Sequence, residues 1–390
     1  MCRRVTGILL ATLLFLSGCH IPAGTTSVAV PTSTPTQPLP TTTPAAVLTR
    51  VQGEVRLQQV ITGQLVSASF GDYLWRGDVI VAGQDAQAEA VCSDGESLRV
   101  EHDQSVTVTC GETPDPVYQR VIVRVHGEQI EALPATRPIP PEGGNLPVVL
   151  SPRNTRLVER RPAIRWQAVQ GAEDYEVVVS GPQGELWRAT TQETELPYPD
   201  AQPALEAGAS CLIQVTARTG PTGQPRPSET VLVTVLSAAE ADQVRQFETQ
   251  IEALGLSVES ARFFLATYYA DLELYDAAIT ELVSLAEEIP SPLAHRLLGD
   301  VYLAIGLDGQ AAQSYQEALR LAQEQGNRLV QAEAEVGLGQ VEFARKSFEP
   351  ALSHFRAALM LYQELGLEDN AEAVAKLVAD TETRLPTPTP

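Results

Sequence analysis

Side chains able to perform catalysis or to bind a metal are few in this sequence and lie far apart. The histidines are His20, His102, His126, His295 and His354. None falls in a His-Glu-x-x-His arrangement, and no Cys-x-x-Cys pair supplies the spacing typical of a zinc site. The phosphate loop Gly-x-x-x-x-Gly-Lys-Ser/Thr and the nucleophile elbow Gly-x-Ser-x-Gly are also missing. We therefore expect no catalytic residues, no metal and no cofactor, and a protein that is not an enzyme.

Cys19 ends a stretch with the pattern of an export signal. The stretch begins with the positive pair Arg3-Arg4, continues with the apolar run Ile8–Leu16 and closes with the small residues of Leu16-Ser17-Gly18-Cys19. This pattern resembles the lipobox of bacterial lipoproteins. The resemblance implies cleavage before Cys19, diacylglycerol on its thiol and acylation of the new N-terminus, so that lipid anchors the chain outside the cytoplasm, in the cell membrane or an outer membrane. A simple cleaved secretory peptide and an uncleaved anchor helix are the alternatives, but a membrane span needs about 20 apolar residues.

Composition and charge describe the remainder as a tethered protein of two to three domains. The chain has 390 residues, 44% of them hydrophobic, which is ordinary for a folded soluble protein. Its net charge of -22 argues against nucleic acid and against electrostatic docking on anionic lipid. A Pro/Thr-rich stretch after Cys19 predicts an extended spacer that holds the folded part away from the membrane.

Short alternating segments after the spacer predict a compact all-β domain. Gly and Asp turns separate them, and the most distinctive stretches are Val51-Gln-Gly-Glu-Val55, Phe70 to Ile80 and Ala88 to Leu98. The matching positions are Gly71, Leu74, Gly77, Asp78, Ile80 and the hairpin turn Asp94-Gly95. The order resembles the FecR-like domain, which in signalling proteins relays the state of an outer-membrane receptor to a sigma factor. This chain shows neither an anti-sigma segment nor a transmembrane helix, so we do not expect direct sigma regulation, and each matching residue can equally be a turn residue only.

Cysteines in this predicted domain raise the question of a disulfide. Cys92 and Cys110 lie in neighbouring predicted strands, in a compartment that permits disulfides. A bridge would add about 3 kcal/mol in the chain-entropy model. Two buried free thiols are the alternative, and Cys211 is then the odd cysteine, which we expect to be buried in a strand.

A Pro-rich bridge leads to a second alternating region that predicts a β-sandwich. Ile164-Arg-Trp166, Gly171-Ala172, Tyr175 and Leu205-x-x-Gly208 are similar to fibronectin type III domains, although Cys211 stands where that family has the tyrosine of its corner motif. Trp166 is expected in the core. Trp187, beside Tyr198, either packs inside or is exposed as a platform for a glycan ring.

From Ser237 onward the hydrophobic period becomes 3.6, which predicts helices. Small and aromatic residues recur with one spacing in Leu298-Gly299, Tyr302, Ala311, Tyr315 and Ala318, and again 40 residues later in Leu338-Gly339, Ala351, Phe355 and Ala358. The spacing resembles tetratricopeptide (TPR) repeats, and a weaker copy begins at Leu265. Small residues at these offsets let paired helices approach closely, while the aromatic fills the gap to the next repeat. We expect a helix at Ala238–Leu254 and a capping helix at Glu368–Leu385.

The resulting fold class is multidomain, with two all-β domains followed by an all-α TPR solenoid. The boundaries are a signal peptide (1–18), a Pro/Thr-rich linker (19–45), a FecR-like domain (46–132), a Pro-rich linker (133–147), a fibronectin type III-like sandwich (148–236), TPR repeats with a capping helix (237–385) and a disordered tail (386–390).

Such solenoids present a concave groove to protein partners. The offsets that face it place Arg296, Asp300, Leu303, Gln340 and Phe343 there as candidate partner-binding residues. The expected function is a membrane-anchored extracytoplasmic scaffold that binds protein partners in the cell envelope, without nucleic acid. The alternatives are a module that binds cell-wall glycan or peptidoglycan, with Trp187 as its contact, and an envelope signalling component related to FecR.

Overall fold

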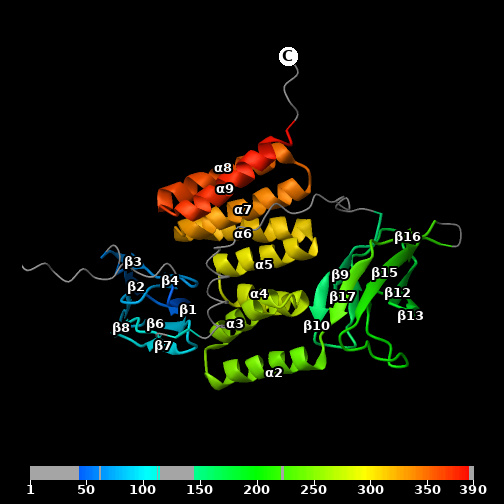
Figure 1. Ribbon diagram of the computed structural model, residues 1–390, viewed down its shortest axis with the longest axis horizontal. Coiled ribbons are helices and arrows are strands. Elements are labelled where there is room, and N and C mark those ends of the chain that lie inside the picture. The colour runs from blue at the N-terminus through cyan, green and yellow to red at the C-terminus, as the bar shows by residue number, and fades with distance from the viewer. Residues whose placement is uncertain (1–43, 61–62, 112, 115–144, 221–223, 386–390) are drawn as a thin grey trace, which may run out of the picture. The chain divides into compact units, whose positions relative to one another are not determined.

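The computed structural model describes residues 44–60, 63–111, 113–114, 145–220 and 224–385. The predicted signal peptide, the lipidation site Cys19, most of both linkers and the tail lie outside the described residues. Within the described part, β-sheets between residues 46 and 235 are followed by helices from 238 to 382, which confirms the predicted order of β domains and helical domain (Figure 1). No helix in these ranges is long and apolar enough to cross a membrane.

The first β domain packs two antiparallel sheets, ordered β4-β1-β6-β7 and β3-β2-β5-β8, around one core. Its strands are β1 (Ala46–Gln52), β2 (Val55–Gln58), β3 (Leu65–Ser67), β4 (Tyr73–Leu74), β5 (Val79–Ala82), β6 (Gln87–Cys92), β7 (Ser97–Val100) and β8 (Ser105–Thr107). The buried carboxylate of Asp78 accepts hydrogen bonds from the backbone N–H groups of Val60 (2.7 Å) and Trp75 (2.8 Å). Asp78 therefore fastens the turn that precedes β5.

A disulfide joins Cys92 to Cys110, with their Cα atoms 5.5 Å apart. Of the two alternatives left open by the sequence, the structure has the bridge. The hairpin between β6 and β7 turns at Asp94-Gly95, where Gly95 has a φ of 86° and donates to the carbonyl of Cys92. The predicted turn is confirmed, and the bridge ties its base to the segment after β8.

The sheet containing β1 and β6 is buried on both faces. Leu48 and Ala90 point into the core of the first β domain, whereas Val47 and Val91 pack in a different cluster with residues of the helices. A strand buried on both faces reads as a continuous apolar run instead of an alternation. This second buried face is the first indication that the helices cover part of the β domain.

The second β domain is a sandwich of a sheet ordered β10-β17-β15-β12-β13, with β16 attached to β15, and a sheet ordered β14-β11-β9. Its strands are β9 (Val149–Ser151), β10 (Thr155–Leu157), β11 (Ile164–Trp166), β12 (Asp174–Gly181), β13 (Gly184–Thr191), β14 (Glu195–Leu196), β15 (Ser210–Arg218), β16 (Arg226–Pro227) and β17 (Val231–Val235). Trp166 lies in the core as expected, edge-on to Tyr175, with ring centroids 5.4 Å apart. Cys211 is a buried free thiol in β15, also as expected.

The helices are α2 (Ala238–Ala253), α3 (Val258–Asp271), α4 (Tyr275–Glu288), α5 (Pro292–Ile305), α6 (Asp308–Gln325), α7 (Arg328–Ala344), α8 (Phe348–Leu365) and α9 (Glu368–Glu382). They stack in chain order (Figure 1). Ser237 and Glu240 form a capping box that starts α2. Gly306, Gly326 and Gly366 end α5, α6 and α8 in the left-handed conformation that favours glycine.

The sandwich is bonded to the helices by short polar contacts. The hydroxyl of Thr155 donates to the carbonyl of Glu273 (3.0 Å) and accepts from the N–H of Tyr275 (2.9 Å), and the buried guanidinium of Arg153 donates to the carbonyl of Ile305 (2.8 Å). These bonds satisfy backbone groups in the turn between α3 and α4, at the start of α4 and at the end of α5. The sandwich thus serves as a cap for several helix termini.

Candidate functional site

Helices α3, α5 and α7 are the first members of successive helix pairs, and we call the surface they share the α3/α5/α7 face. The ring of Tyr315 in α6 sets the spacing between two of these helices. A Cβ atom built on Gly299 would lie 2.6 Å from the Tyr315 ring, and one on Gly337 would lie 2.4 Å from it. The glycines therefore admit the ring, and the aromatic fills the gap between α5 and α7 in the way the repeat spacing predicts.

Arg296 lies at the centre of this face and is only 5% exposed. Its guanidinium pairs with Asp300 (2.5 Å) and with Glu333 of α7 (3.3 Å). Asp300 also accepts a hydrogen bond from the Tyr315 hydroxyl (2.7 Å). The structure therefore brings two of the predicted groove residues together, with Arg296 buried between its partners and the side chain of Asp300 still 37% exposed.

The electrostatics of this network follow from its burial. Burial raises the pKa of Glu333 to about 7, although the charge of Arg296 acts to lower it. Burial also acts to lower the pKa of Arg296, but Glu333 and Asp300 outweigh it and hold that pKa above its usual value. Arg296 is therefore charged at every pH of interest, while Glu333 titrates near neutrality.

The other three predicted groove residues do not form an open groove. Phe343 is buried in the core with its ring edge-on to Phe348, the centroids 5.3 Å apart. Gln340 is also buried, and Leu303 is half-buried. The expectation that Arg296, Gln340 and Phe343 are accessible to a partner is corrected, because neighbouring side chains already cover them.

A segment of the first β domain lies on the α3/α5/α7 face. The ring of Phe70 meets Phe263 of α3 edge-on, with centroids 5.4 Å apart and planes at 90°. A Cβ on Gly71 would lie 2.3 Å from the Leu293 side chain of α5. Tyr73 packs against the same apolar cluster and is close enough to Glu333 and Arg296 for their charges to act on it. The face is thus occupied by the turn between β3 and β4.

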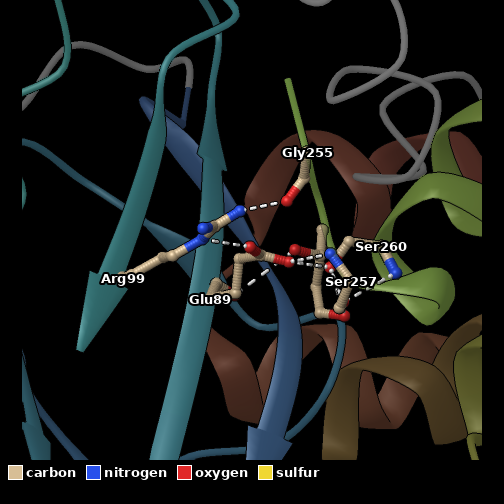
Figure 2. Close-up of polar contacts among 6 residues, drawn as sticks. Glu89, Arg99, Gly255, Ser257 and Ser260 are labelled. Carbon is tan, nitrogen blue, oxygen red and sulfur yellow. Dashed lines mark hydrogen bonds and ion pairs between the residues drawn. The ribbon is translucent and has the colours of Figure 1, made fainter. Parts of the chain in front are cut away.

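A carboxylate fixes the same β domain at the start of α3 (Figure 2). Glu89 in β6 is only 4% exposed, and its Oε2 accepts hydrogen bonds from the Ser257 N–H (3.0 Å) and the Ser260 hydroxyl (2.6 Å). Arg99 donates to its Oε1 (2.9 Å) and also to the carbonyl of Gly255. Glu89 therefore binds the N–H of the N-cap residue Ser257, as the glutamate of a capping box does, but from another domain and at the positive end of the helix dipole.

The balance of effects on Glu89 keeps it ionised. Burial acts to raise its pKa, but the hydrogen bonds from Ser260, Ser257 and Arg99 together outweigh burial and place the pKa below its usual value of 4.5. A buried carboxylate with several donors is a strong contact, since removal of one partner leaves the others unsatisfied.

Sequence reasoning missed Phe70, Tyr73 and Glu89. Residues Ala86–Val91 alternate, which puts Glu89 with Gln87 on the expected polar face, so no local pattern indicates that this strand is buried on both faces. A charge in a buried strand implies a partner. Phe70 and Tyr73 carried no local signal, because only the tertiary structure places their rings against the helices.

Trp187 is not an exposed platform. It is 3% exposed, with its ring edge-on to Tyr198 at a centroid distance of 5.3 Å in the core of the sandwich. The hydroxyl of Tyr198 donates to the carbonyl of Pro203 (2.7 Å), which fastens the loop before β15. The glycan contact proposed for Trp187 is therefore corrected, because the alternation along β13 directs this ring inward.

A cavity of about 420 Å³ lies between the sandwich and helices α3 and α4. The hydroxyl of Ser151 donates to Asp276 (2.9 Å), and that of Tyr269 donates to Glu248 (2.7 Å). Burial raises the pKa of Asp276 to about 6 despite the bond from Ser151. Asp276 and Glu248 thus each have a hydroxyl partner, and no group of metal-ligating side chains occurs among the described residues.

No protein-family model matches the chain, and no curated protein matches it. One solved structure, of a cell surface anchoring domain, is 20% identical over 18% of this chain and 97% of its own, with a TM-score of 0.17. Another, the beta-1,2-glucanase from Parabacteroides distasonis, is 11% identical over 76% of this chain and 50% of its own, with a TM-score of 0.20. Likeness at this level carries no argument about function.

Proposed function

We propose that the protein is a membrane-anchored extracytoplasmic scaffold whose helical part binds protein segments. One observation carries this proposal: the α3/α5/α7 face already holds a protein segment, the turn containing Phe70 and Gly71, through an aromatic contact and a close backbone approach. A surface that accepts an aromatic turn and contains a buried arginine has the aromatic and arginine side chains that are enriched at protein-binding sites.

The three domain resemblances remain part of the proposal. The FecR-like identification is supported by the structural roles of Gly71 and Asp78 in the turns around β4. The fibronectin-like identification is supported by a three-stranded sheet packed on a larger one in the second β domain. The TPR identification is supported by the glycine–aromatic packing of Tyr315 between helix pairs. Cys19 would supply the lipid anchor.

A cross-linked pull-down from envelope fractions tests the proposal. The chain from Ala45 onward is compared with the same chain ending at Leu236, and with a full-length Glu89→Ala variant that loosens the β domain from α3. We expect specific proteins to be recovered by the full chain, in larger amount by Glu89→Ala, and to be lost when the helices are removed.

The glycan alternative predicts a different result. Equal retention of muropeptide by the full and shortened chains, with no protein specific to the helices, would contradict the scaffold and assign function to the β domains. Because Trp187 is buried, no particular contact now favours that alternative.

A further inference from the structure

We propose that the α3/α5/α7 face recognises an aromatic β-turn of the type Phe-Gly-Asp-Tyr in a protein partner, and that the chain's own turn, Ser69–Tyr73, is its resting occupant. Partner and first β domain would then compete for one surface. This inference rests on the proposed function and deepens it, because it states the chemistry of the partner and the condition under which the partner gains access.

The occupying segment is a well-formed turn before it meets the helices. The N–H of Asp72 donates to the carbonyl of Ser69 (3.1 Å), and the Asp72 carboxylate accepts from the Ser69 N–H (2.7 Å). Gly71 has a φ of 88°, which a type II turn requires at this position. Two further backbone bonds join the turn to β1, from the Gly71 N–H to the Leu48 carbonyl (2.7 Å) and from the Leu48 N–H to the Asp72 carbonyl (2.9 Å). A turn held in this way by its own bonds and by the β domain loses little further conformational entropy on docking.

Two positions of the turn make the apolar contacts. The ring of Phe70 contacts Phe263 edge-on. Gly71 has no side chain, and this leaves room for the side chain of Leu293. Any L-residue in place of Gly71 would both clash with Leu293 and adopt an unfavourable backbone conformation. The face therefore selects an aromatic residue followed by glycine.

Tyr73 supplies the polar end of the segment. Burial raises its pKa well above 10.0, and the next largest influences come from Glu333 and Arg296. A phenol hydroxyl can both donate and accept, so it suits a site that contains a buried carboxyl and a buried guanidinium.

The docked arrangement has the features of an interface that opens. A cavity of about 210 Å³ lies beside Phe70, and polar side chains such as Arg50 and Gln325 line it. The domain is also held through hydrogen bonds to Glu89 (Figure 2) and not through apolar packing alone. The contact thus combines a fully buried apolar part, with Val47 and Val91, and a looser polar part beside Phe70. Interfaces of such mixed character between domains resemble those of transient complexes.

The test uses a fluorescent peptide with the sequence of residues 67–74, SASFGDYL, and fluorescence anisotropy with three full chains. These are the wild type, an open variant Phe70→Ala/Glu89→Gln, and a control variant Leu65→Ala, which changes an exposed residue of the same domain. We expect the open variant to bind at least tenfold more tightly than the wild type and the control, because its own turn no longer competes.

Peptide variants keep the protein constant and test the recognition itself. Replacement of the peptide's phenylalanine or glycine by alanine should weaken binding to the open variant at least tenfold, and the scrambled peptide should not bind. Circular dichroism of the open variant, matched to the wild type, establishes that the helices are intact.

Equal peptide affinity for the open and wild-type chains, or peptide binding that tolerates both alanines, would overturn the inference and identify the contact as a permanent domain interface. The pull-down distinguishes the two proposals. If a protein is recovered through the helices but the peptide does not bind, the proposed turn specificity is wrong and the scaffold proposal stands. If the peptide binds but no protein is recovered, the scaffold proposal is wrong and the turn specificity stands.

Discussion

Glu89 accepts a hydrogen bond of 2.6 Å from the hydroxyl of Ser260, across 171 positions of sequence. The first belongs to a strand of the first β domain, and the second lies in the opening turn of α3 (Figure 2). One carboxylate thus completes a helix terminus that the local sequence had capped only with Ser257. The relationship makes the stability of α3 depend on the presence of the β domain.

Replacement of Glu89 by glutamine should weaken the contact between the first β domain and α3. It should also remove the pH dependence of this contact. Because the pKa of Glu89 is lowered in the folded chain, its contribution is present above pH 4.5 and is lost as the pH falls through the folded value. Glu89→Gln should cost about 1–3 kcal/mol at pH 7, and hydrogen exchange at the start of α3 should become faster. The exposed Glu96→Gln is the matched control. Unchanged exchange in Glu89→Gln would contradict the capping role.

The buried Glu333 should make the folded chain less stable as the pH rises, which is the opposite of the pH dependence expected from Glu89. Its folded pKa of about 7 exceeds the ordinary 4.5, so the folded chain holds a proton that the unfolded chain releases, and stability falls as the pH rises between these values. Glu333→Gln should remove this fall and gain on the order of 2 kcal/mol at pH 8 relative to pH 5. Urea unfolding of both proteins across this range is the measurement. A parallel pH profile in the variant would show that Arg296 already keeps Glu333 ionised.

Replacement of Gly71 by alanine should lower the free energy of unfolding more than the same replacement at Gly63, another glycine with positive φ. Gly63 has a φ of 65° and open space around it, whereas Gly71 combines a φ of 88° with the approach of Leu293. We expect Gly63→Ala to cost about 1 kcal/mol from backbone strain and Gly71→Ala about 2–4 kcal/mol from strain and overlap together. Chemical denaturation provides both values. Equal losses would mean that Leu293 does not press on the turn.

The packing of Tyr315 against Gly299 should reverse the usual effect of alanine in a helix. Alanine normally stabilises a helix by about 1 kcal/mol over glycine, but at Gly299 its Cβ would lie 2.6 Å from the ring. Gly299→Ala should therefore destabilise the wild type by about 1–3 kcal/mol. In a Tyr315→Leu background the same change should be neutral or stabilising, as measured by a double-mutant denaturation cycle. Additive effects would rule out the contact as the cause.

Trp187→Ala should reduce stability and leave any glycan retention of the intact fold unaltered. The ring is buried against Tyr198, and removal of such a side chain costs about 3–5 kcal/mol. Thermal unfolding measures the loss, and muropeptide retention is compared below the unfolding transition. Leu186→Ala, at an exposed neighbour in β13, is the control. A large loss of retention without a loss of stability would restore the surface role of the tryptophan.

Two helices, the first and the last of the helical part, could be predicted to within three residues because their ends carry local signals. Ser237 starts α2 at the expected place, and α2 ends at Ala253, one residue before the predicted end. The predicted capping helix begins at Glu368 as α9 does and ends three residues later than Glu382. Capping serines, glycines after the last turn and a 3.6 period all act over a few residues.

The strands missed by pattern analysis are short, such as β4 (Tyr73–Leu74) and β14 (Glu195–Leu196). Two residues contain no alternation, so only tertiary pairing defines them. The docking of Phe70 on Phe263 had no local signal for the same reason. Repeat spacing correctly placed Arg296 and Asp300 on one helix face, but it could not reveal that another domain of the same chain covers that face.

The double burial of the β1 and β6 sheet also has a consequence for the order of synthesis. Ser260 is made 171 residues after Glu89, which at about 5–20 residues per second is a delay of roughly ten to thirty seconds. During this interval Val47, Val91 and Phe70 have no helix to cover them. The β domain therefore exposes an apolar surface during synthesis until the helices that cover it have been made.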